Sequence, residues 1–182
     1  TNDTETARKL LRQAIELDDT LIAAKVLLGW TYSEMGDYDE AMKIYTPALE
    51  QAEELGNKAG MGASLNNIGS VHYYKGEYDK ALDYYERALK IQEELGDKAG
   101  MGFNLLTIGI VHSNRGEYNK AVESLEKSLS IQKEIGLKEL ELLTTTYLYL
   151  SYRHLGKDYD EQDIHSLIKD ADNIEFEANF RL

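Results

Sequence analysis

The sequence contains no cysteine, so neither disulfide bonds nor thiolate metal sites are available to it. A chain without cysteine suits the reducing cytoplasm, where we expect the protein to act. Long apolar runs are missing as well, because no stretch approaches the roughly 18 uninterrupted apolar residues of a membrane span. We therefore expect no membrane insertion.

Positive charge is scarce, since 20 lysines and arginines face 33 aspartates and glutamates, for a formal net charge of −13. No basic stripe can neutralise phosphates, which argues against nucleic acid and against anionic membrane surfaces as partners. The hydrophobic fraction of 42% still permits a packed core. The chain starts at Thr1 without a methionine or a signal peptide and stops on the apolar Phe180-Arg181-Leu182, so we interpret it as a segment of a longer protein.

An internal repeat dominates the sequence. Residues 56–95 and 96–135 are identical at about half of their positions at a fixed offset of forty. Weaker copies flank this pair. We assign a half repeat at 4–18, repeats at about 19–56, 57–96, 97–136 and 137–172, and a capping or continuing helix at 173–182.

Each copy has the pattern of two helices. Apolar residues recur at three- and four-residue steps over 61–75 and again over 78–95, and no strand pattern appears. Gly76 stands between the two helices and Gly96 ends the second, where a left-handed C-terminal cap needs glycine. Asn57 and Asp97 precede the following helices and are suited to cap them. The sequence therefore predicts an all-α fold.

The small-residue signature Gly69…Gly76…Tyr78…Ala81…Tyr85…Ala88 resembles the tetratricopeptide repeat. The Leu-Gly-Asp-Lys-Ala-Gly-Met-Gly linker resembles the forty-residue variant of that repeat, found in kinesin light chains, LGN-type polarity scaffolds and bacterial signalling proteins. The resemblance implies a right-handed superhelical solenoid of antiparallel helix hairpins, with about four repeats after the N-terminal half repeat.

Glycines and alanines recur where helices should cross closely. Ala81 and Ala121 mark this position on second helices, and Gly29, Gly69 and Gly109 mark it on first helices. A mid-helix glycine costs roughly 0.5–1 kcal/mol relative to alanine, so we expect close packing to return that energy.

In the tetratricopeptide family, first helices line the concave surface, and a helically spaced stripe maps there in each copy. The stripe varies between copies that are otherwise half identical, as a binding surface would. It also includes Leu106, and Asn66 with Asn67 has the donors and acceptors to bind the backbone of an extended peptide. Aromatic members are typical anchors, with inter-repeat packing as the open alternative. The predicted peptide-binding residues are Trp30, Asn66, Asn67, Ser70, Tyr73, Tyr74, Phe103, Thr107, Ile110, Asn114, Tyr147 and Arg153.

Catalytic and metal chemistry finds little support. His72 and His112 occupy equivalent positions, about a helix spacing apart, whereas metal ligands converge within about 2.1 Å of one ion, so we expect them to be partly buried and stacked. The phrase Lys58-Ala59-Gly60-Met61-Gly62 opens a helix and follows no strand, which excludes a phosphate loop. We expect no enzyme activity, cofactor or metal.

The predicted function is a protein-protein interaction scaffold whose groove binds a peptide or protein segment. One alternative is a regulatory segment of a larger signalling protein, such as a nucleotide cyclase or kinase. Another is self-association through the solenoid ends. Arg153 is the only strong cation on the predicted stripe, so the lysine-rich clamp that some family members use for a terminal carboxylate is not expected.

Overall fold

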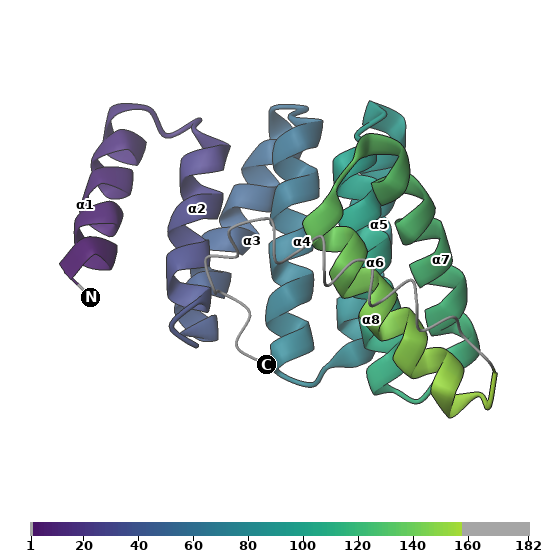
Figure 1. The fold of residues 1–182 in the computed structure, drawn as a ribbon. Coiled ribbons are helices and arrows are strands. Elements are labelled where there is room, and N and C mark those ends of the chain that lie inside the picture. Colours follow the sequence, from purple (N-terminus) through teal and green to yellow (C-terminus); the bar gives the residue numbers. More distant parts are fainter. Residues whose placement is uncertain (1, 158–182) are drawn as a thin grey trace. The chain divides into compact units, whose positions relative to one another are not determined.

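The computed structural model describes residues 2–157, and every regular element in this range is an α-helix (Figure 1). The all-α prediction is therefore confirmed. The expected remainder of the fourth repeat and the expected helix at 173–182 lie outside the described residues. The helices in the described range are α1 (Asn2–Leu17), α2 (Ile22–Ser33), α3 (Tyr38–Glu54), α4 (Lys58–Tyr74), α5 (Tyr78–Leu95), α6 (Lys98–Asn114), α7 (Tyr118–Ile135) and α8 (Lys138–His154).

The chain divides into two compact units, Thr1–Gly96 with α1 to α5 and Asp97–Leu182 with α6 to α8. The division coincides with the predicted boundary between the repeats at 57–96 and 97–136. Within each unit, consecutive helices form hairpins that pack side by side (Figure 1). The assignment of one solenoid domain over 1–182 stays a prediction.

Glycines in the left-handed conformation end the helices at a regular interval of twenty residues. Gly76 follows α4 with φ 74°, and Gly96 caps α5 with φ 67°, as the sequence predicted. A side chain at such φ values is strained, whereas glycine adopts them without a Cβ clash. In the described part of the chain every residue with positive φ is a glycine of this series, namely Gly36, Gly56, Gly76, Gly96, Gly116, Gly136 and Gly156.

The predicted N-terminal caps of the first helices are also confirmed. The Asn57 side chain accepts a hydrogen bond of 2.9 Å from the Gly60 amide, and Asp97 accepts one of 3.0 Å from Gly100. Each cap satisfies one amide that the helix start would otherwise leave without a partner. The repeated linker therefore starts α4 and α6 in the same way.

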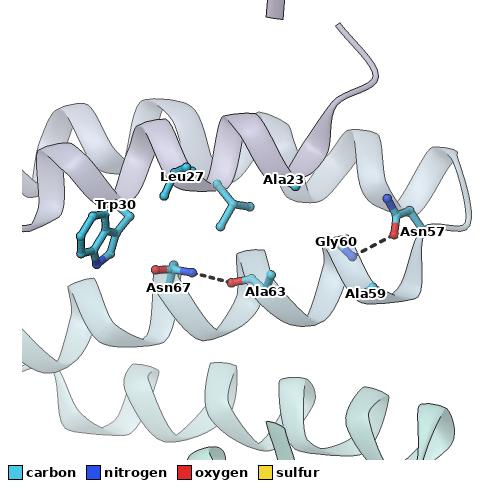
Figure 2. Close-up of a pocket in the computed structure, with 9 residues that line it drawn as sticks. Ala23, Leu27, Trp30, Asn57, Ala59, Gly60, Ala63 and Asn67 are labelled. Carbon is cyan, nitrogen blue, oxygen red and sulfur yellow. Dashed lines mark hydrogen bonds between the residues drawn. The ribbon is translucent and has the colours of Figure 1, made fainter. Parts of the chain in front are cut away.

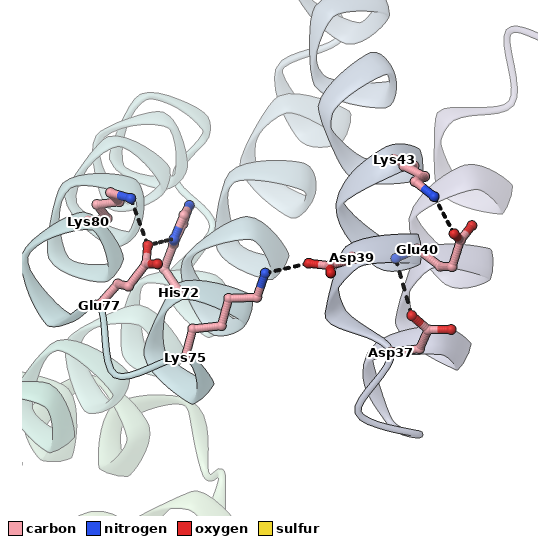
Figure 3. A network of polar contacts seen from close by, with 8 residues as sticks. All are labelled: Asp37, Asp39, Glu40, Lys43, His72, Lys75, Glu77 and Lys80. Atoms are coloured by element: carbon pink, nitrogen blue, oxygen red, sulfur yellow. Dashed lines mark hydrogen bonds and ion pairs between the residues drawn. The ribbon is translucent and has the colours of Figure 1, made fainter.

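A different contact holds the turns of the α4–α5 and α6–α7 hairpins. Glu77 is the N-cap residue of α5, and its carboxylate lies 2.8 Å from Nδ1 of His72 near the end of α4 (Figure 3). Glu117 and His112 repeat the contact at 2.9 Å in the second unit. The His72 ring stacks on Tyr84, with centroids 5.3 Å apart. These contacts support the structural role expected for the two histidines.

The core of the first unit lies between α3, α4 and α5. Ala41, Tyr45, Leu65, Ile68 and Val71 are all at most 2% exposed. In the second unit, Leu106, Ala121, Leu125 and Leu148 form the corresponding cluster. Within each unit, neighbouring helices bury their apolar faces against one another, which is the way repeat proteins build a core.

Close helix approach occurs at the predicted glycines, but the residue opposite each of them is large. A Cβ on Gly69 would lie 2.8 Å from the Tyr85 ring, and one on Gly109 would lie 2.6 Å from Leu125. Gly29 faces Tyr45 in the same way. Glycine is therefore required because a tyrosine or leucine of the second helix fills the space above it.

Candidate functional site

An apolar groove lies in the first unit between α2 and α4, the first helices of two adjacent repeats. Its volume is about 500 Å³, and Figure 2 shows Trp30 and Asn67 at one end and Asn57 at the other. Among the described residues, no charged side chain lines it. Its walls comprise Ala23, Val26, Leu27, Trp30, Asn57, Ala59, Gly60, Ala63 and Asn67.

The α2 wall arises from the helical spacing of its apolar residues. Val26, Leu27 and Trp30 lie three and four residues apart, so they share one side of the helix. Gly29 lies on the other side, where it packs on Tyr45. Leu27 is 49% exposed and Trp30 is 46% exposed. The helix therefore presents a large apolar surface to solvent at this groove.

Small residues make the α4 wall and allow the helices to come close at one end. A Cβ on Gly60 would lie 2.8 Å from Ile22 of α2, so a larger residue would push the two helices apart. Ala59 and Ala63 continue this shallow wall along α4. The large side chains of one helix thus face the small side chains of the other, which leaves room for a ligand side chain.

The amide of Asn67 is already engaged inside the protein. Its Nδ2 donates to the Ala63 carbonyl at 2.8 Å, and its Oδ1 accepts from the Tyr45 hydroxyl at 3.2 Å. Burial, and secondarily the charge of Glu34, raises the pKa of Tyr45, so this hydroxyl stays a donor. Each amide atom of Asn67 thus has one of its two hydrogen-bonding positions occupied within the protein, and its predicted contact with a peptide backbone stays a prediction.

The neighbouring predicted residues turn toward the protein. Ser70 Oγ donates to the Asn66 carbonyl at 3.1 Å and accepts from the Tyr85 hydroxyl at 3.1 Å. The Asn66 Oδ1 atom is buried and has no hydrogen-bond partner within residues 2–157. Neither Asn66 nor Ser70 lines the groove, so among the predicted residues only Trp30 and Asn67 meet there.

Tyr73 and Tyr74 belong to an aromatic cluster at the C-terminal end of α4. Tyr74 stacks on Tyr38 with centroids 5.8 Å apart and planes at 5°, and Tyr73 meets the Tyr74 edge at 5.3 Å. Tyr78 lies 5.9 Å from Tyr73. Tyr74 remains 62% exposed. The cluster thus combines inter-helix packing with an exposed ring.

An ion pair spans the same end of the first unit. Lys75, which follows α4, contacts Asp39 at the start of α3 at 2.7 Å (Figure 3). The hydrogen bond from this ammonium, followed by its charge, holds the pKa of Asp39 below its ordinary value. The Asp39 carboxylate therefore stays ionised at neutral pH.

In the second unit the predicted residues divide between packing and exposure. Ile110 and Tyr147 pack against the core cluster, and Thr107 bonds to the Asn104 carbonyl at 2.9 Å. Phe103 is 38% exposed, and Asn114 and Arg153 are exposed.

The assignment of Leu106 to the predicted concave stripe needs a correction. It is 1% exposed and belongs to the core of the second unit, together with Leu125 and Leu148. Helical spacing gave its angular position on α6, but the packing of α7 and α8 in this unit decided that the position is buried.

The sequence interpretation missed Asn57, Ala59 and Gly60. They belong to the repeated linker, where their small size and capping chemistry were assigned to helix initiation alone. The signal that could have identified them is Ala59-Gly60 itself, since two small residues one turn before Ala63 predict a shallow helix face.

Within residues 2–157, no group of three histidine, aspartate or glutamate side chains is placed to hold a metal ion. None of the helices in that range combines the length and apolar character needed to cross a membrane.

Comparison with protein families gives matches to the family model for the tetratricopeptide repeat over residues 20–94 and 60–134. No curated protein matches the sequence significantly. One similar solved structure is BtubC (BKLC) from P. vanneervenii, with a TM-score of 0.78 and 21% identity over 99% of this chain and 78% of that one.

Two further structures extend the comparison. Aspartyl phosphate phosphatase F from Bacillus subtilis has a TM-score of 0.76 and 23% identity over 94% of this chain but 46% of that one. MamA has a TM-score of 0.65 and 18% identity over 96% of this chain and 91% of that one. At such identities the likeness shows the fold alone.

Proposed function

Because this chain belongs to the tetratricopeptide-repeat family, whose members generally mediate protein-protein interaction, we propose that it binds a segment of a partner protein in the groove between α2 and α4. Apolar side chains of that segment fill the space between Trp30 and Ala63. The proposal concerns binding and assigns no catalytic step to the chain.

The observation that carries the proposal is the pairing of a large exposed apolar wall with a small-residue wall. Trp30 and Leu27 keep nearly half of their surfaces exposed, although α4 lies beside them. The groove volume of about 500 Å³ lies inside the range of roughly 300–1,000 Å³ typical of ligand pockets. Buried aromatic anchors such as tryptophan supply much of the affinity in protein interfaces.

The polar contacts favour apolar recognition over backbone recognition. Asn67 already makes one hydrogen bond within the protein through each of its amide atoms, so only the second N–H of Nδ2 and the second lone pair of Oδ1 are left for a ligand. Trading one hydrogen bond for another changes the free energy of binding little. The affinity is therefore expected to follow the apolar area that the ligand buries.

A random-peptide library selected on the purified chain tests this proposal. Trp30 is the only tryptophan, so its fluorescence reports directly on groove occupancy by selected peptides. Leu27→Lys places a charge in the groove and should abolish binding. Leu95→Lys is the matched control, because Leu95 is 48% exposed at the end of α5 and lies outside the groove.

Peptides that lose affinity for Leu27→Lys and keep it for Leu95→Lys would support the proposal. Equal affinity for both variants would contradict it and would move binding to another surface. Circular dichroism on both variants serves as the folding control.

Self-association is a second candidate, and one observation favours it. On α1, Leu10 is 60% exposed and Leu17 is 89% exposed, so this helix presents apolar surface that nothing covers within the described residues. Repeat proteins need a polar outer face at each end to stay separate. Sedimentation over a concentration series tests this candidate, and a monomer at the highest concentration would contradict it.

The third candidate, a regulatory segment of a larger signalling protein, draws on the likeness to aspartyl phosphate phosphatase F. In that comparison the match spans 46% of the longer chain, so a helical repeat of this kind forms part of a larger protein there.

A further inference from the structure

The groove changes chemical character at its Trp30 end. Glu34 is the C-cap residue of α2; it follows Trp30 by four residues in helical conformation and therefore continues the same side of the helix. On α4, Tyr74 follows Asn67 by seven residues, two helical turns further along the same side. The helical spacing thus places a carboxylate beyond Trp30 on one wall and an aromatic ring beyond Asn67 on the other, outside the residues that line the groove.

The position of Glu34 one helical turn beyond Trp30 agrees with its electrostatic effect on Tyr45. The charge of Glu34 acts on the buried Tyr45 hydroxyl, which donates to Asn67 in the groove wall. Glu34 is exposed, and within residues 2–157 it forms no ion pair. A carboxylate in this position is available to a cationic group of a ligand.

The Tyr74 ring is held in place, and its side chain is 62% exposed. Tyr38 stacks on it, and Tyr73 lies beside it with the two ring planes at 67°. Asp37 and Asp39 flank Tyr38 in the sequence and both are exposed, although Asp39 pairs with Lys75. A tyrosine ring held in this way is suited to a planar cation, since the face of the ring attracts positive charge.

The chain contains contacts between a guanidinium and a tyrosine ring among its own residues. The Arg8 guanidinium lies 3.9 Å from the centroid of the Tyr32 ring, and the Arg87 guanidinium lies 5.3 Å from that of Tyr84. Tyr74 is specific to its copy, because the equivalent position forty residues later is Asn114. The exposed ring therefore does not follow from the repeat framework.

We propose that the Trp30 end of the groove selects an arginine of the partner segment, whose guanidinium stacks on Tyr74 and pairs with Glu34. This inference rests on the proposed function and adds the chemistry of the partner. The net charge of −13 complements such a basic ligand. Two helical turns separate Asn67 from Tyr74, so the apolar anchor and the arginine of the partner should lie about 10 Å apart.

The library selection described above also tests the inference. The sequences enriched on the wild-type chain should combine an apolar residue with an arginine at a fixed spacing. One enriched peptide is then resynthesised with lysine or with citrulline, which is uncharged, in place of arginine. Affinity should fall about two- to five-fold with lysine and further with citrulline, because lysine lacks the planar group and citrulline lacks the charge.

Variants of the protein test which of its residues recognise the arginine of the peptide. Tyr74→Leu and Glu34→Gln should each lower affinity for the arginine peptide about two- to five-fold and leave affinity for the citrulline peptide unchanged. Glu86→Gln is the matched control, since Glu86 is exposed on α5 and the charge change is the same. Raising the salt concentration should reduce the effect of Glu34→Gln.

The outcomes separate the two proposals. The enriched peptides could lose affinity for Leu27→Lys and yet carry no arginine, or their affinity could be the same for wild type, Tyr74→Leu and Glu34→Gln. Either result overturns this inference and agrees with the proposed function. A selection that enriches no peptide contradicts the proposed function and this inference together.

Discussion

Two glycines of the same helix predict opposite effects of the same substitution. Gly62 and Gly69 both lie in α4, and alanine is favoured over glycine in a helix interior by roughly 0.5–1 kcal/mol. A Cβ on Gly62 would make ordinary contact with Ile91 at 3.5 Å. Gly62→Ala should therefore raise the free energy of unfolding by about 0.5–1 kcal/mol.

Gly69→Ala should lower the free energy of unfolding. The new Cβ would lie 2.8 Å from the Tyr85 ring, which is 2% exposed and tied to Ser70 through its hydroxyl. Overpacking of this kind typically costs about 1–3 kcal/mol, and the helical gain offsets only part of it. The net loss should be about 0.5–2 kcal/mol.

Urea unfolding followed by far-UV circular dichroism measures both variants, with unchanged m-values as the check that only stability differs. The Tyr85→Ala background provides a second control, because Gly69→Ala should stop being harmful once the ring is gone. If Gly69→Ala were as stable as Gly62→Ala, the assignment of Gly69 to close helix packing would be refuted.

Three further substitutions follow from the structure. Glu141 is 1% exposed, and its Oε1 has no hydrogen-bond partner among the described residues, while its Oε2 pairs with the exposed Lys138 at 3.4 Å. The two preceding copies have Met61 and Met101 at this position, so Glu141→Met should stabilise the second unit by about 1–3 kcal/mol in urea unfolding, and a loss of stability would refute this. A hydrogen bond from Lys80, followed by one from His72, lowers the pKa of Glu77 below 4.5, so its stabilising contribution is present above pH 4.5 and is lost as the pH falls through the lowered value. Glu77→Gln should accordingly flatten the acid limb of a pH titration of stability, and an unchanged limb would count against the contact. Asn57→Ala should lower the stability of the fold by about 0.5–2 kcal/mol through the lost cap, as measured by thermal unfolding. An unchanged melting temperature would show that the cap does not contribute to stability.

The sequence by itself determined the helices and the places where they end. Glycine at every twentieth residue and the Asn57 and Asp97 caps act within a few residues of the chain, so local chemistry is sufficient to predict them. The forty-residue identity fixed the hairpin as the repeating unit, because the same local signals recur in each copy.

Tertiary structure alone decided which side chains of the predicted stripe are available. Trp30 and Ala63 line the same groove because α2 packs beside α4, while the amide of Asn67 is engaged by Tyr45 from a third helix. Leu106 satisfies the same helical spacing and is nevertheless buried.

Equivalent positions of the repeat show the physical reason. Ala7 and Ala41 correspond at an offset of thirty-four, yet Ala7 is exposed on α1 and Ala41 is completely buried on α3. The residue type and its angular position on the helix are encoded locally in the sequence. Burial depends on whether another helix covers that face, and only the packing of the helices in three dimensions supplies that neighbour.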